Sequence, residues 1–424
     1  MESRPYFSIC VPTRNRSETL LYCLKTLLDQ DFDSYEIIVS DNSDIEENRT
    51  KEVINQLNSS KIKYFRQHTV LSMTENYEFA LSKAYGKFIT CLGDDDGLIV
   101  NSLSYVKRFI EHYDATVVKC AEPVYWWPGS HVHPQSAMTF PYERPVSKIL
   151  SKSSLGKVAN FELSYFNLPM LYYSFISRDI IDEVIAEKGS FFQNCSSIDM
   201  YSGFVIAYKT ESYFITDKPF VIPGLSSKSN GSSTTVSYEN KIAKEFLFQN
   251  KLQGDFQKYH IPFLPKFNLA LFVWSELSKF IENYNLKESL HIEYKNIFVE
   301  MISSDSTINN LNNIGDLENF NEYPLYKQDI DFFKSNFLEK TLYYLRSGNN
   351  NTLIYQSFAV DPLLFSVKDI YGASLLCKNL MEARKNNLPL EVELKPASMK
   401  PTRTIFQRIS SRLSRTAKML ITGK

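Results

Sequence analysis

The chain has 424 residues, enough for two or three domains, and its 43% hydrophobic content is that of an ordinary globular protein. Its 14 glycines are too few for a low-complexity chain, and its six cysteines form no CxxC pair, which disfavours zinc and redox motifs. The net charge of −1 hides an asymmetry, because residues 397–424 carry seven Lys or Arg and no acid. That asymmetry is typical of a basic tail with an anionic partner.

No signal-peptide pattern opens the chain, because residues 1–5 lead directly into an apolar run. No uncharged apolar stretch approaches the roughly 20 residues needed to span a bilayer. We therefore expect a cytoplasmic protein.

The first 120 residues alternate strand and helix patterns. Strands are expected at residues 7–11 (ended by Pro12), 35–40, 62–66, 88–92 and 116–120, with helices between them. Asn15, followed three residues later by Glu18, reads as a capping box that opens the first helix. Strands separated by helices predict βαβ units and a mainly parallel sheet.

The rest of the chain divides less sharply. Residues 121–145, rich in proline and aromatic side chains, indicate a long loop of the kind that forms functional lids. Helical patterns dominate from about residue 239 to 390, for example at 269–281 and 330–346. We expect four parts: a ligand-binding half of an α/β domain (1–120), its second half (121–238), a helical domain (239–396) and a basic amphipathic tail (397–424).

The most informative motif is Asp94-Asp95-Asp96, which directly follows the expected strand at 88–92. Adjacent carboxylates repel, so a fold tolerates them most easily when a cation neutralises them. Mg²⁺ and Mn²⁺ often use one or two carboxylates together with substrate phosphates. Because α/β folds bind ligands at the carboxyl edge of the sheet, the cluster predicts a metal–diphosphate site. A solvated acidic turn is the alternative interpretation.

Two further strand ends share this edge. Asp41 follows the second strand, and the turn Pro12-Thr13-Arg14-Asn15-Arg16 follows the first. A carboxylate can accept a hydrogen bond from a base, turn amides can bind ribose or phosphate, and a metal can bridge phosphates. The three strand ends together suit a nucleoside diphosphate.

Four blocks, in this order, resemble the nucleotide-binding half of glycosyltransferase family 2: residues 7–16, 36–43, 76 with 84–89, and 92–96. The resemblance weakens towards residue 230 and does not reach the C-terminal part. It implies an α/β GT-A fold, after which the helical patterns predict an α-helical C-terminal domain. It also implies an inverting enzyme that moves a sugar from a nucleoside-diphosphate sugar, commonly UDP-linked, to a hydroxyl acceptor with Mg²⁺ or Mn²⁺.

The resemblance assigns residues position by position. Asp41 matches the acid that recognises the base, Asp96 the metal ligand, and Asp94 a second ligand nearer the ribose or sugar. The nucleotide-binding set it implies is Pro12, Thr13, Arg14, Asp41, Asn76, Asp94 and Asp95. Glu75 stands where many members have an arginine, so we expect donor binding to differ there.

The resemblance also requires a general base near the start of a helix in the acceptor half, and Asp199 is the best match. An aspartate at that place can equally serve only to stabilise the helix. Asp179 and Asp182 are nearby competitors that read as capping and surface residues.

Weaker signals have ordinary alternatives. His131 and His133 could bind a metal, and Trp126 and Trp127 could stack on a sugar. The loop that contains Lys228 could contact a phosphate. Exposure, packing and plain flexibility explain them as well or better.

The resemblance implies a saccharide or lipid-linked acceptor in bacterial surface polysaccharide or glycolipid assembly. Residues 400–424 would then contact an anionic membrane at the inner face of the plasma membrane. No nucleic-acid partner is expected, and the oligomeric state is left open. Two rivals are a non-catalytic nucleotide- or glycan-binding module and a nucleotidyltransferase. The second is disfavoured because the turn at residues 12–16 lacks glycine.

Overall fold

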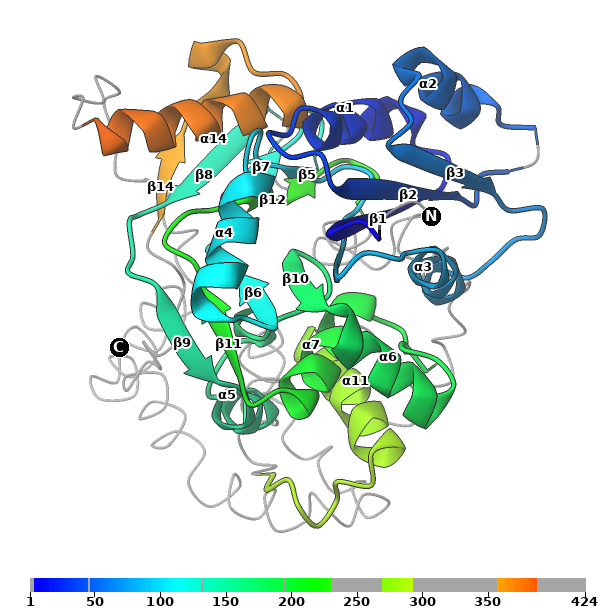
Figure 1. Cartoon of the computed structure of the whole chain (residues 1–424), viewed down its shortest axis with the longest axis vertical. Helices are drawn as coiled ribbons and strands as arrows, with labels where there is room; N and C mark the ends of the chain where they lie inside the picture. Colours follow the sequence, from blue (N-terminus) through cyan, green and yellow to red (C-terminus); the bar gives the residue numbers. More distant parts are fainter. Residues whose placement is uncertain are drawn as a thin grey trace, which may run out of the picture.

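A computed structural model describes residues 4–44, 46–130, 133, 135–193, 195–229, 269–292 and 357–386. Over these residues the chain forms a layered α/β structure around one large sheet (Figure 1). The expected α/β class is therefore confirmed.

The large sheet has eight strands within the described residues, in the order β3-β2-β1-β4-β10-β6-β11-β9. Their bounds are β3 Ile62–Arg66, β2 Tyr35–Asp41, β1 Phe7–Thr13, β4 Phe88–Cys91, β10 Ser174–Ser177, β6 Val117–Lys119, β11 Ser212–Ile215 and β9 Ser147–Leu150. The first four strands are parallel, as is the β6–β11 pair, whereas β10 runs antiparallel to both of its neighbours. The parallel half brings the carboxyl ends of β1, β2 and β4 to one edge.

Helices cover both faces of this sheet. One face carries α1 Ser17–Leu28, α2 Arg49–Leu57 and α4 Leu103–Tyr113, and the other carries α3 Met73–Ser82, α5 Ser151–Ala159, α6 Arg178–Lys188 and α7 Ile198–Lys209 (Figure 1). Side chains alternate along β1, so that Ile9 and Val11 pack towards α1 while Cys10 packs towards α3. Burial on both faces explains why these strands read as continuous apolar runs.

Two local expectations near β1 are wrong. The strand continues through Pro12 to Thr13, which is possible because Cys10 is the last residue of β1 paired with β4. The missing N–H of Pro12 therefore removes no hydrogen bond to β4. Asn15 does not cap α1, which begins at Ser17. Asn15 has a left-handed φ of 55°, and its side-chain amide donates to Asp44 over 2.9 Å.

Residues 121–145 are not a single loop. They contain β7 Val124–Trp126 and β8 Ala137–Pro141, which pair antiparallel in a four-stranded sheet of the described residues, ordered β13-β7-β8-β14. The outer strands are β13 Gly224–Leu225 and β14 Ser357–Val360, and β5 Gly97–Leu98 pairs with β12 Val221–Ile222. These short strands fold the chain after residue 220 back beside the end of β4.

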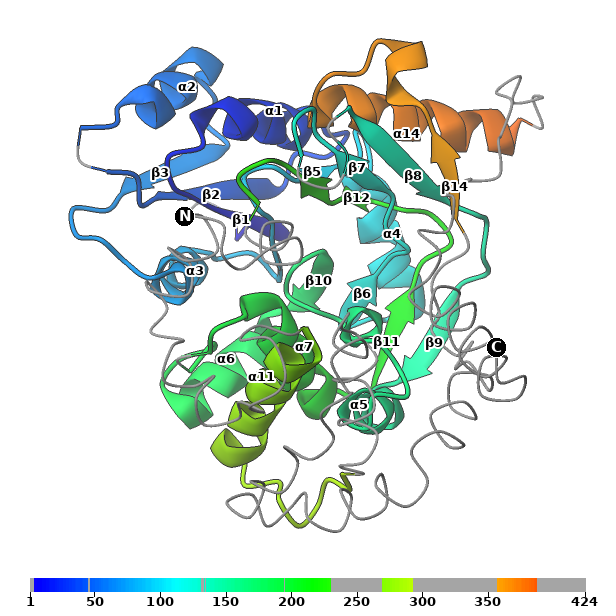
Figure 2. The same cartoon turned by 180° about the vertical axis from the view of Figure 1, so that it is seen from behind.

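The C-terminal elements that the structure describes pack on the α/β part. Helix α11 Leu269–Asn283 confirms the helix expected there, and α14 Ile370–Lys385 lies beside α1 (Figure 2). The hydroxyl of Tyr371 donates to Asp29 over 2.8 Å, which joins α14 to the end of α1. Two short 3₁₀ turns, η1 Tyr165–Asn167 and η4 Pro362–Phe365, complete the elements of the described ranges.

The expected boundaries of the four parts stay a prediction, because the segment 330–346 and the tail from residue 397 lie outside the described residues. Among the helices that are described, none is both long and apolar enough to cross a membrane.

Candidate functional site

The three carboxylates of Asp94, Asp95 and Asp96 lie in the turn between β4 and β5. They expose only 3%, 5% and 2% of their surface. The cluster is therefore a buried acidic site rather than a solvated turn. Each carboxylate meets its own set of hydrogen-bond donors.

Asp94 is tied to the turn that follows β1. The hydroxyl of Thr13 donates to one oxygen over 2.7 Å, and the Arg16 guanidinium donates to the other over 3.2 Å. Burial raises the pKa of Asp94, and Arg16 opposes that rise. Arg16 was not among the residues predicted for the site. Its position in the turn after the first strand, which was predicted to contact the ligand, is the feature of the sequence that indicates it.

Asp95 and Asp96 are held from a distant part of the chain. Ser226 donates to Asp95 through its hydroxyl at 2.7 Å and its amide at 3.2 Å. Asp96 accepts from the amides of Gly93 and Gly224, both at 2.7 Å, and from the Tyr173 hydroxyl at 3.1 Å. Even so, burial and the neighbouring charge of Asp95 raise the pKa of Asp96 well above its usual range.

The chain at Gly224 passes so close to the cluster that no side chain fits there. A Cβ at this position would lie 1.8 Å from the backbone oxygen of Asp95. The same oxygen accepts the indole N–H of the buried Trp127 over 2.9 Å. Trp127 thus packs beneath the acidic turn, which supports the packing interpretation over a sugar platform for this residue.

Asp41 lies at the end of β2, directly beside Thr13 in the β1–β2 register. It is completely buried, and one of its oxygens accepts from the Tyr64 hydroxyl at 2.7 Å and from Arg66 at 2.5 Å. The other oxygen accepts the amide of Ser43 at 2.9 Å. Thr13 therefore links two of the predicted acids, Asp41 and Asp94, at one sheet edge.

The remaining predicted nucleotide contacts have local partners. Arg14 pairs with Asp44 over 3.4 Å at the surface. Asn76 exchanges hydrogen bonds with Ser40, accepting its hydroxyl at 2.6 Å, and so fastens α3 to β2. Glu75 completes a capping box with Ser72 at the start of α3. Nucleotide binding by Pro12, Arg14 and Asn76 stays a prediction.

Asp199 lies in the first turn of α7, where it accepts a hydrogen bond from the Ser197 hydroxyl. Burial raises the pKa of Asp199. Burial, and after it the negative charges of Asp96, Asp95 and Asp199, raise the pKa of the Tyr173 hydroxyl. The role of Asp199 as the base stays a prediction, while its competitor Asp182 pairs with Arg178 on α6.

The backbone of Tyr173 adopts a left-handed φ of 65°. An aromatic residue rarely does so, and such strain persists only where the surroundings hold it. Sequence reasoning missed Tyr173, because nothing local marks the conformation or the contact with Asp96.

The described residues contain no group of three or more His, Cys, Asp or Glu side chains arranged to hold a metal ion by themselves. His133 packs against the ring of Trp126, and His131 lies outside the described residues. The acidic cluster does offer buried oxygen ligands with surplus negative charge. It fits a hard cation shared between one or two carboxylates and a bound diphosphate.

Comparisons with known proteins find glycosyltransferases. Residues 8–176 match the family model described as glycosyl transferase family 2. The GalNAc(5)-diNAcBac-PP-undecaprenol beta-1,3-glucosyltransferase of Campylobacter jejuni is 39% identical over 103 residues, which are 24% of this chain and 33% of the relative. A second relative, from Escherichia coli, is 28% identical over 154 residues, covering 34% of this chain and 53% of the relative. The chain thus spans between a third and about half of these curated relatives.

Solved structures give weaker likenesses. TarS 1–349 of S. aureus in complex with UDP-GlcNAc has a TM-score of 0.43 at 16% identity, covering 70% of this chain and 84% of that chain. The mannosyltransferase PcManGT of Pyrobaculum calidifontis in complex with GDP-Man and Mn²⁺ scores 0.39 at 12% identity, covering 81% and 88%. Likenesses of this size carry no argument about the chemistry of the site.

The Arg66–Asp41 pair gives a test of how the edge is held together. Replacing Arg66 by Met leaves a completely buried carboxylate without its cation, so we expect the free energy of unfolding to fall by about 2–4 kcal/mol. Chemical denaturation monitored by tryptophan fluorescence measures it. The control is Arg14→Met, which breaks a pair whose acid is 63% exposed and should change stability by less than about 0.5 kcal/mol. Equal losses in both variants would contradict the structural role given to Arg66.

Proposed function

Because residues 8–176 of this chain belong to glycosyl transferase family 2, we propose that the protein is an inverting glycosyltransferase. Its donor is a nucleoside-diphosphate sugar, and its acceptor is a hydroxyl group. The observation that carries the proposal is the buried cluster Asp94–Asp96: Asp94 accepts a hydrogen bond from Thr13, the neighbour of Asp41 in the sheet, and Asp96 accepts one from Tyr173.

The donor lies along the edge formed by the ends of β1, β2 and β4. Asp41 resembles the acid that recognises uracil, so the donor we propose is UDP-linked, with Thr13 at the nucleoside. Asp94 and Asp96 are the residues that would hold Mg²⁺ or Mn²⁺. When bound, that ion stabilises the negative charge that develops on the departing nucleoside diphosphate.

Asp199 acts as the general base. Its carboxylate takes the proton of the acceptor hydroxyl while the hydroxyl oxygen forms a bond to the anomeric carbon. The bond from that carbon to the diphosphate oxygen breaks on the opposite side, so the configuration inverts. The raised pKa of Asp199 suits this role, because a base works best when its pKa approaches the working pH.

The acceptor we propose is a lipid-linked saccharide. The Campylobacter jejuni relative is named for a PP-undecaprenol substrate, which supports this choice. The basic tail at residues 400–424 would then hold the enzyme on the anionic inner face of the plasma membrane, where such an acceptor resides.

Replacing Asp199 by Asn tests the base. We expect kcat to fall by about 10²–10⁴-fold, because the amide cannot accept the proton, while the affinity for UDP stays within about twofold. Sugar transfer is measured with a panel of nucleotide sugars, and UDP binding by calorimetry. The control is Asp182→Asn on α6, which should keep its activity. Near-normal turnover by Asp199→Asn would rule out this base.

Replacing Asp96 by Ala tests the metal site. Calorimetry of UDP binding with and without Mn²⁺ should show that the ion raises the affinity of the unaltered protein at least tenfold. In Asp96→Ala that gain should disappear, because one carboxylate ligand is lost. Asp44→Ala, at the exposed surface, is the control and should keep the gain. A metal-dependent affinity that survives in Asp96→Ala would place the ion elsewhere.

A further inference from the structure

Helix α11 brings a completely buried carboxylate, Glu276, to the start of α7. One oxygen of Glu276 accepts the backbone amides of Ser196 at 2.9 Å and Ser197 at 3.0 Å. Lys279, one turn further along α11, contacts the other oxygen at 3.2 Å and donates to the Ser196 hydroxyl at 2.5 Å. The carboxylate thereby fixes the backbone that leads directly into the first turn of α7.

The side chain of Ser197 makes an unusual hydrogen bond for a serine that directly precedes a helix. Ser197 is the residue that precedes α7, and serine there ordinarily accepts a hydrogen bond from the helix backbone. Its side chain makes no such bond. Its hydroxyl donates instead to the carboxylate of Asp199. A short path therefore runs from Glu276 through the backbone of Ser197 to Asp199.

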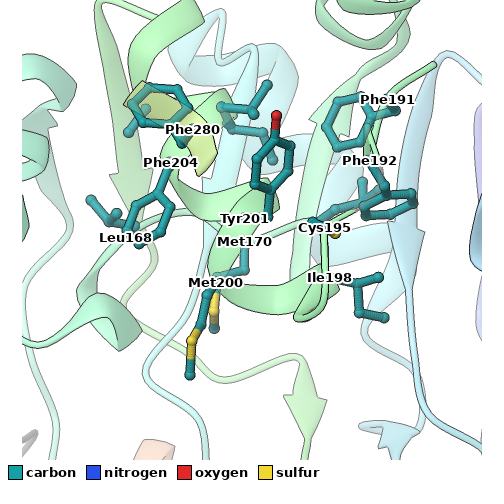
Figure 3. Close-up of a cluster of buried hydrophobic side chains, with 14 of the residues drawn as sticks. Leu168, Met170, Phe191, Phe192, Cys195, Ile198, Met200, Tyr201, Phe204 and Phe280 are labelled. Carbon is teal, nitrogen blue, oxygen red and sulfur yellow. The ribbon is translucent and has the colours of Figure 1, made fainter. Parts of the chain in front are cut away.

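Apolar packing sets α11 against α7 without help from Glu276. Figure 3 shows Phe280 of α11 beside Phe204 of α7, and their ring centroids are 5.8 Å apart. Asn283 donates to the hydroxyl of Tyr201 over 2.7 Å, which fixes the register of the two helices. A buried carboxylate costs free energy even when it is bonded, so packing alone does not explain an acid at position 276.

We infer that Glu276 is a positioning residue for sugar transfer: it holds Ser196 and Ser197 so that the Ser197 hydroxyl aims the carboxylate of Asp199 at the acceptor. This inference rests on the proposed role of Asp199 as the base. It makes a helix that lies far beyond residue 176, the end of the family match, a part of the catalytic machinery. Small displacements of a catalytic group cost large factors in rate.

The test is a double-mutant cycle in the full chain with Glu276→Gln and Asp199→Asn. Glu276→Gln alone should lower kcat by about 10–100-fold and leave the UDP affinity within about twofold. In the Asp199→Asn background the same change should cause no further loss, because the group that Glu276 positions is already disabled. Glu282→Gln, on the exposed side of α11, is the matched control and should keep full turnover.

Other outcomes would overturn the inference. Multiplicative losses in the double variant would mean that Glu276 acts independently of Asp199, and an equal loss of UDP affinity would mean a general structural role. If Asp199→Asn itself keeps its turnover, Asp199 is not the base. That result is distinct from the results that contradict only the role of Glu276.

If Glu276→Gln does not fold, Ser197→Ala tests the same positioning of Asp199. The hydroxyl of Ser197 lowers the pKa of Asp199, so its removal should shift the acidic limb of the pH profile of kcat/KM to higher pH and lower kcat about tenfold. The other titratable groups that face Asp199 are Tyr165, Tyr173 and Cys195, whose pKa values are all raised and which stay neutral over that range. An unchanged profile would overturn the inference.

Discussion

The burial of three adjacent carboxylates at the end of β4 is the constraint on which the surrounding structure depends. Buried charges of one sign repel and are tolerated only when donors or cations surround them. Arg16 supplies the ion pair described for Asp94, while Ser226 and the amide of Gly224 bind the two acids that follow. These contacts join the turn after β1, the end of β4 and the chain after β12.

The same constraint explains why the site is assembled from segments as far apart in the sequence as Thr13 and Ser226. Ser226 and Gly224 reach the cluster because β12 pairs with β5, which begins at Gly97 directly after the acidic turn. Tyr173 directly precedes β10, the antiparallel strand beside β4, and its hydroxyl donates to Asp96. The acidic turn is therefore held in part by residues from distant segments of the sequence.

Much of the sheet edge that holds Asp41 and Asp94 could be predicted from the sequence. Continuous apolar runs marked the buried parallel strands, and strand ends in a parallel sheet must meet, so Asp41 and Asp94 were brought together correctly. Tyr173 and Ser226 lie 77 or more residues away in sequence from the acids that they contact. No pattern in the nearby sequence indicates such contacts. The strands β7 and β8 resemble a loop in the sequence because they are short and the segment around them is rich in proline. The contact of Asn15 with Asp44 overrides the capping pattern that the sequence shows there.

The most direct test of the central claim is anomalous X-ray diffraction from crystals grown with UDP and Mn²⁺. We expect one manganese peak between the carboxylates of Asp94 and Asp96 and the diphosphate, with the uracil beside Asp41. Such a peak would mean that the buried acids exist to hold a metal–nucleotide pair. A manganese peak away from Asp94–Asp96, or ordered UDP without manganese at these carboxylates, would contradict that claim.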